Sequence, residues 1–201
     1  MTDATTDQRL IKGARARATI ARHAADVAST EGLTGLSLGR LAADLGLSKS
    51  GVATLFGSKE NLQLAAVQSA REVFVERVVR PALAAGPGVD RVRALVDEWL
   101  EYVREPVFPG GCFRSATIAE FDSRPGAIRD ALIADRADWL GLLSREIARA
   151  QADSDSSARD PDGVAFEIDA VLVATNTALQ LGDSDAIERS RGVVEWILAD
   201  L

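Results

Sequence analysis

Apolar residues recur at helical spacing along almost the whole of this chain, and no alternating strand pattern continues beyond four residues. A clear example is the series Leu62, Ala66, Ala70, Phe74 and Val78, whose spacing of four places it on one helix face. Glycines, prolines and the polar run 153–157, which we interpret as a surface loop, divide the pattern into segments. We therefore predict an all-α fold of about nine helices.

The length and composition place the chain among soluble globular proteins. Its 201 residues are enough for one ordinary domain, or for one domain with a small appendage. With 47% hydrophobic and 26% charged residues, wholesale disorder is excluded. No apolar run approaches the roughly 20 residues that span a membrane, and the first residues lack the apolar stretch of a signal peptide. We expect a cytoplasmic protein with no membrane partner.

The chain offers little for catalysis or metal binding. Its single cysteine, Cys112, cannot form a disulfide within the chain, which fits a reducing cytoplasm. With His23 as the single histidine, almost nothing remains to ligate zinc or a transition metal. No nucleophile–base pair or phosphate-binding loop is present. We predict a protein that is not an enzyme and has no metal and no cofactor, in which Cys112 acts as a small buried apolar residue rather than a redox-sensing thiol.

The charge is distributed unevenly. The net charge is −7, but residues 1–60 hold 8 Lys and Arg against 6 Asp and Glu. Residues 61–201 hold 15 against 24. Because phosphate contact depends on a local basic face rather than on total charge, only the first 60 residues offer a surface for nucleic acid.

Two short helices in this first part form a helix-turn-helix pattern. We predict them over residues 38–45 and 49–56, with Ser37 and Ser48 as their N-caps. The turn between them has Gly46 where the chain must bend, and Leu47, which we expect to be a buried wedge. Taken alone, the pattern also fits any tight corner between two helices.

The wider pattern is more specific. Residues 35–52 (GLSLGRLAADLGLSKSGV), followed by residues 56–62 (FGSKENL), closely resemble the DNA-binding region of tetracycline-repressor-like (TetR/AcrR) regulators. The resemblance implies a three-helix DNA-binding domain over residues 1–60 and a helical ligand-binding and dimerisation domain over 61–201. It also implies a homodimeric one-component regulator, a repressor that binds a pseudo-palindromic operator on double-stranded DNA and is released by a small hydrophobic effector.

The recognition helix departs from the family at Ala53, where many members carry an aromatic residue, usually tyrosine. The alternative is therefore an all-helical ligand-binding or interaction protein whose helix-turn-helix no longer binds DNA. Under the leading hypothesis, hydrogen-bonding groups and a close backbone approach come from residues that helical geometry turns outward. Our DNA-binding candidates are Ser37, Lys49, Ser50, Gly51, Thr54 and Lys59, the last resembling the family's phosphate-contacting lysine.

Aromatic residues gather between residues 74 and 139, in several different predicted helices. Binding sites for small molecules are typically apolar with a few placed polar groups. We predict a mostly apolar effector pocket, with Asn176 as a polar anchor, and a packed core is the alternative. The candidate lining residues are Trp99, Tyr102, Phe113, Thr117, Trp139 and Asn176.

The last two predicted helices, over residues 161–181 and 183–201, carry more apolar surface than one subunit of this size needs. They resemble the four-helix dimer interface of the family. Packing within the subunit is the alternative. The candidate interface residues are Ile168, Leu172, Leu179, Val194 and Ile197.

Overall fold

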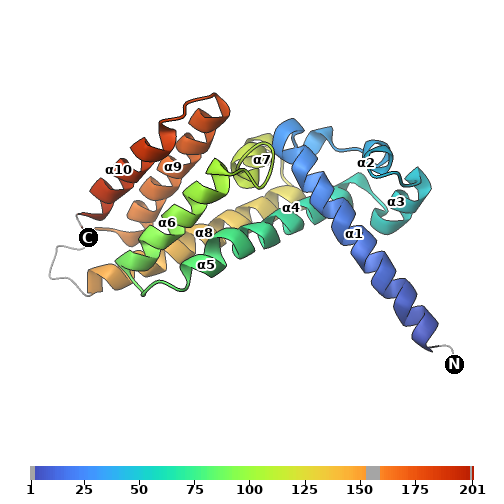
Figure 1. The fold of residues 1–201 in the computed structure, drawn as a ribbon, viewed down its shortest axis with the longest axis horizontal. Helices are drawn as coiled ribbons and strands as arrows, with labels where there is room; N and C mark the ends of the chain where they lie inside the picture. The colour runs from blue at the N-terminus through green and yellow to red at the C-terminus, as the bar shows by residue number, and fades with distance from the viewer. Residues whose placement is uncertain (1–2, 153–158, 200) are drawn as a thin grey trace.

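The computed structural model describes residues 3–152, 159–199 and 201, and every regular element in these ranges is helical (Figure 1). The all-α prediction is therefore confirmed. The polar loop expected at residues 153–157 lies outside the described residues. In chain order the elements are α1 (Asp3–Glu31), the 3-10 turn η1 (Leu33–Gly35), α2 (Leu38–Asp44), α3 (Lys49–Phe56), α4 (Lys59–Phe74), the π-helical segment η2 (Val75–Val79), α5 (Arg80–Ala82), α6 (Val89–Arg104), α7 (Phe113–Phe121), α8 (Ala127–Ala152), α9 (Pro161–Gln180) and α10 (Ala186–Leu198).

The two short helices begin where serine caps were expected. The Ser37 hydroxyl accepts a hydrogen bond from the amide of Arg40, and the Ser48 hydroxyl accepts one from the amide of Gly51. Each bond satisfies one of the free N–H groups of a first helical turn. The expectation for Leu47 is wrong: its side chain is exposed, because the bend at Gly46 turns it outward.

The first and last helices differ from the sequence prediction in length. The helical spacing of alanines predicts a first helix over residues 10–30, whereas α1 begins at Asp3. No proline or glycine interrupts residues 3–9, and acidic residues favour a helix N-terminus. We expected the last helix to begin at Asp183, but that residue forms a turn in which its carboxylate accepts from the amide of Asp185 (3.1 Å), so α10 begins at Ala186.

The molecule is elongated, with α2 and α3 at one end and α9 and α10 at the other (Figure 1). We call residues 3–57 the head and residues 59–152 with 159–199 the body. The helix α4 begins beside the head, packs against α1 and continues into the body against α8. One apolar core runs through both parts. None of the described helices combines the length and the apolar character that crossing a membrane requires.

Candidate DNA-binding and ligand sites

The outer surface of α3 carries the predicted DNA-binding residues. Lys49, Ser50, Gly51 and Thr54 are all exposed, while Val52 and Phe56 on the other side of α3 are buried in the core. The Thr54 hydroxyl donates to the carbonyl of Ser50 (2.9 Å), as is common within helices. Lys49 makes no hydrogen bond or ion pair with any described residue, so its ammonium group is available to a partner.

The other two candidates lie beside α3, at the starts of α2 and α4. Ser37 is exposed and caps α2. Lys59 is exposed in the first turn of α4, and its ammonium donates to the carbonyl of Thr34 (2.6 Å). Because an ammonium group has three donors, this bond leaves two for another acceptor.

A residue that the sequence analysis did not select holds the end of α3. Arg17 of α1 donates to the carbonyl of Leu55 (2.6 Å), and its guanidinium lies 4.5 Å from the centre of the Phe56 ring. This cation–π contact and the hydrogen bond fix α3 against α1. Nothing in the spacing of the sequence pairs these residues, which are 38 positions apart.

Glu120 of α7 joins the body to the head. Its carboxylate accepts from the amide of Leu33 (2.8 Å), the amide of Thr34 (3.1 Å) and the hydroxyl of Thr34 (2.7 Å). Gly32 approaches so closely that a Cβ atom there would lie 2.6 Å from this carboxylate. The α1–α2 connection is thus held by an acid from the middle of the chain, another contact that the sequence did not reveal.

A second connection ties the loop before α7 to α1. Arg22 donates to the carbonyl of Val107 (2.9 Å), and its guanidinium lies 4.2 Å from the centre of the buried Phe108 ring. The amide of Gly110 donates to the Ser29 hydroxyl (3.0 Å). The head is therefore contacted at two places, by α7 itself and by the loop that precedes it.

The predicted effector residues form a packed core instead of an open pocket, which corrects the expectation of a cavity among them. All six are buried. Phe74 contacts the edges of Tyr102 and Trp139, with ring centres 5.8 and 5.3 Å apart, and these aromatic contacts fill the space. A cavity of about 10 Å³ remains beside Phe113, and one of about 40 Å³ beside Trp99, enough for only one to a few waters.

The polar members of this group are already engaged. The side-chain carbonyl of Asn176 accepts from the amide of Cys112 (2.8 Å), and the Thr117 hydroxyl donates to the carbonyl of Phe113 (2.9 Å). Asn176 is therefore a helix cap for α7 and not a free ligand anchor. Cys112 is buried, as expected.

Ion pairs extend from this core towards α9. Arg114 donates to Asp135 (2.7 Å), and Arg136 donates to the buried Asp169 (2.8 Å), which also accepts from the Trp139 indole (3.1 Å). Burial is the largest single influence and opposes the charge of Arg114, but the negative charges of Asp135 and Asp169 and the hydrogen bond to Asp135 act with the other neighbours to raise the pKa of the guanidinium.

Burial raises the pKa of the Tyr102 hydroxyl well above its ordinary value. This phenol therefore stays neutral within the core. The described residues contain no cluster of histidine, cysteine, aspartate or glutamate that could hold a metal ion.

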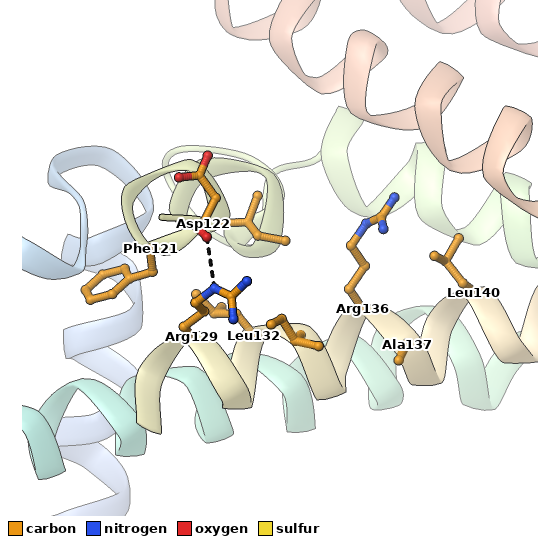
Figure 2. A pocket seen from close by; sticks show the side chains of 9 residues that line it. Phe121, Asp122, Arg129, Leu132, Arg136, Ala137 and Leu140 are labelled. Atoms are coloured by element: carbon orange, nitrogen blue, oxygen red, sulfur yellow. Dashed lines mark hydrogen bonds between the residues drawn. The ribbon is translucent and has the colours of Figure 1, made fainter. Parts of the chain in front are cut away.

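An open groove of about 280 Å³ lies between α7 and α8 (Figure 2). Its wall is mainly apolar, with two arginines and one aspartate among the apolar side chains. None of the predicted effector residues lines it. The lining residues are Ile118, Phe121, Asp122, Arg129, Leu132, Ile133, Arg136, Ala137 and Leu140.

The predicted dimer residues face the inside of the subunit, which corrects that prediction. Ile168, Leu172, Val194 and Ile197 are buried in the core, and Leu179 is partly buried against it. The helices α9 and α10 have a second apolar side that is exposed. It consists of Phe166, Val173, Val193 and Trp196, of which Trp196 is 71% exposed.

Comparison with known proteins gives the family. Residues 88–194, more than half of the chain, match the family described as the C-terminal domain of tetracyclin repressor-like proteins. No curated protein matches this chain.

Solved structures are similar over nearly the whole length. A TetR transcriptional regulator from Chloroflexus aurantiacus is 26% identical with a TM-score of 0.83, over 91% of this chain and 93% of that one. A TetR-family regulator from Streptomyces coelicolor is 21% identical (TM-score 0.81; 100% and 96% covered). AibR, solved in complex with isovaleryl coenzyme A and operator DNA, is 19% identical (TM-score 0.69; 89% and 96% covered). This chain belongs to the tetracycline-repressor-like family of transcriptional regulators.

Proposed function

We propose that this chain binds operator DNA as a homodimer through α3, and that a small ligand held by the body lowers its affinity for the operator. In this scheme residues 1–60, which include the head, are the DNA-binding part, and residues 61–201 bind the ligand and form the dimer. The observation that carries the proposal is the exposed side of α3, which presents an unpaired lysine and two hydroxyls on a helix whose other side is buried.

On DNA, α3 would lie in the major groove. Lys49 would reach a base edge or a phosphate, Ser50 and Thr54 would hydrogen-bond to either, and Gly51 would allow close approach of the backbone. Lys59 and Ser37 flank α3 and would bind phosphates, which positions the head without reading sequence. Two heads in a dimer would occupy half-sites about one helical turn apart.

For the dimer we propose the exposed side of α9 and α10. This side exposes four apolar side chains to water, those of Phe166, Val173, Val193 and Trp196. Aromatic residues are typical of interface centres. These helices lie at the end of the molecule opposite α3 (Figure 1). Dimerisation there leaves both recognition helices free to contact DNA.

The body would control the head through α7. Because Glu120 holds the α1–α2 connection, a ligand that shifts α7 changes the position of the head. Ligand and operator would then weaken one another's binding by the same factor.

A gel-shift titration against the chain's own upstream intergenic DNA tests DNA binding. Lys59→Ala should weaken binding to operator and random DNA about equally, and lower the salt slope by about one unit. Lys49→Ala should change the preference among operator variants by about 1–3 kcal/mol if it contacts a base. Arg77→Ala removes one exposed body charge as the matched control and should leave binding unchanged.

Unchanged operator affinity in the Lys49→Ala, Lys59→Ala double variant would contradict these assignments. If the wild-type chain binds its upstream DNA no better than random DNA, the helix-turn-helix does not recognise an operator. The interaction-protein alternative would then hold.

A further inference from the structure

We propose that the groove between α7 and α8 binds a small apolar carboxylate, whose charged group lies against Arg129. The inference rests on the proposed function in one respect: this ligand would be the effector that the body holds. It specifies the place of that effector and its chemical class.

The groove has the composition of a site for an amphipathic molecule. Ile118 and Phe121 of α7 face Leu132, Ile133 and Leu140 of α8 across it. Its volume of about 280 Å³ lies at the small end of ligand pockets. An apolar chain or ring of modest size would bury its surface on these side chains.

Arg129 has an uncompensated charge beside this apolar wall. Its Nε donates to the backbone carbonyl of Asp122 (2.9 Å), and no described residue forms an ion pair with its guanidinium. The carboxylate of Asp122 points away from Arg129, as Figure 2 shows. The two terminal nitrogens of Arg129 therefore lack an anionic partner.

Arg136 is held in place by an ion pair on the side of its guanidinium that faces α9. Its Nη2 donates to Asp169, a buried carboxylate that Trp139 also binds, while Nε and Nη1 make no hydrogen bond to described residues. A guanidinium anchored at one nitrogen loses little further entropy when it binds a ligand. The same side chain lines the small cavity beside Trp99, so it lies where the groove meets the core.

The charges of the lining select the ligand class. Arg136 is already paired with Asp169, so the guanidinium that lacks an anionic partner is that of Arg129, which suits a single anionic group and disfavours a cationic ligand. Arginine and carboxylate match as planar partners, each able to form two hydrogen bonds to the other. An apolar monocarboxylate satisfies both the apolar wall and the guanidinium group of Arg129.

The position of the groove connects it to the head. Ile118 and Phe121 line the groove, whereas Glu120 on the same helix binds the amides of Leu33 and Thr34. A ligand that separates α7 from α8 therefore acts directly on the helix that holds the head.

Calorimetric titration of the full chain, without DNA, tests the site with octanoate as the probe and octanamide as its uncharged counterpart. Octanoate should bind the wild-type protein at least about tenfold more tightly than octanamide, because it alone forms an ion pair with Arg129. Arg129→Met should remove about tenfold or more of the octanoate affinity and little of the octanamide affinity.

Two further variants separate the site from general effects. Ala137 is exposed and lines the groove, so Ala137→Glu should preserve folding and abolish octanoate binding by placing a negative charge there. Arg145→Met removes the same charge from α8 outside this groove and should change the affinity by less than about twofold. Thermal unfolding of each variant verifies that it is folded.

Equal binding of octanoate and octanamide by the wild-type protein would overturn the inference, and so would octanoate binding that survives both Arg129→Met and Ala137→Glu. Neither result would contradict the proposed binding to operator DNA, because these titrations contain no DNA. A protein that binds octanoate as described but fails to bind its operator would instead contradict the proposed function.

Discussion

The head and the body of this molecule satisfy the free amides of their helix N-termini in different ways. Around the helix-turn-helix, Ser37, Ser48 and Ser58 each accept a hydrogen bond from the amide three residues later, at 3.2, 3.1 and 3.0 Å. These bonds are local, and all three serines are exposed to water. Short helices in this part of the chain begin where their own sequence places a cap.

In the body, the corresponding bonds come from distant side chains. The amide of Gly88, before α6, donates to the buried Glu146 (3.0 Å), 58 residues away. The amide of Cys112, before α7, donates to Asn176 (2.8 Å), 64 residues away. Among the body helices, α4 and α9 resemble the head, with Ser58 and Asp160 as their own caps. The difference shows that α2, α3 and α4 begin at caps in their own sequence, whereas the starts of α6 and α7 depend on distant helices packing against them.

The largest expected effect separates the two apolar sides of α10. Trp196→Glu should give a folded monomer, with dimerisation at least about 30-fold weaker, because it places a charge at an exposed aromatic centre. Val194→Glu should instead unfold the body, because its charge would be buried without a partner. Sedimentation velocity and circular dichroism measure the two outcomes.

If the Trp196→Glu variant dimerises with unchanged affinity, the dimer interface does not include this side of α10. A folded Val194→Glu variant would show that this buried position tolerates a charge as an exposed position does. Either outcome would break the contrast between an exposed and a buried side of the same helix.

Much of the fold could be predicted from the sequence because its signals are local. Helical spacing predicted the all-helical fold, and the bounds of α3 agree with the predicted range of residues 49–56. Exposure on α3 followed from helical geometry, since Lys49 and Thr54 project away from Val52 and Phe56. A serine cap and an apolar period can both be read from neighbouring residues.

The body was harder to predict because its site depends on contacts between distant segments. Apolar residues on both sides of α9 make Ile168 and Phe166 equal candidates for an interface, and only packing decides that Ile168 is inside. Aromatic residues from several helices can either line a cavity or fill a core. The perpendicular ring contacts of Phe74 with Tyr102 and Trp139 show that they fill a core. The sequence does not show that Asn176 binds the amide of Cys112, because the two residues are far apart along the chain.

A smaller effect is expected where the body meets the head. Glu120→Gln keeps the side-chain shape but removes the charge and turns an amide donor towards the N–H groups of Leu33 and Thr34. Losing charge-assisted bonds should destabilise this connection by about 2 kcal/mol, and amide exchange at residues 33 and 34 should accelerate about 30-fold.

Glu105→Gln, which neutralises an exposed acid in the loop before α7, serves as the control and should leave exchange at residues 33 and 34 unchanged. Equal exchange in wild type and the Glu120→Gln variant would mean that the head is held without this carboxylate. The stability of the α1–α2 connection would then not depend on the body, in agreement with the local caps of α2 and α3.

The smallest expected effect concerns the recognition helix itself. Ser48→Ala removes the hydroxyl that accepts from the amide of Gly51, and we expect a loss of about 1 kcal/mol in unfolding free energy. The cost is modest because this amide is exposed and water replaces the hydroxyl. Ser50→Ala is the matched control on the same turn and should change stability by less than about 0.5 kcal/mol. Urea unfolding gives both values, and equal losses would show that Ser48 does not act as a specific cap. A loss of 3 kcal/mol or more would show that α3, like α7, depends on contacts beyond its own turn.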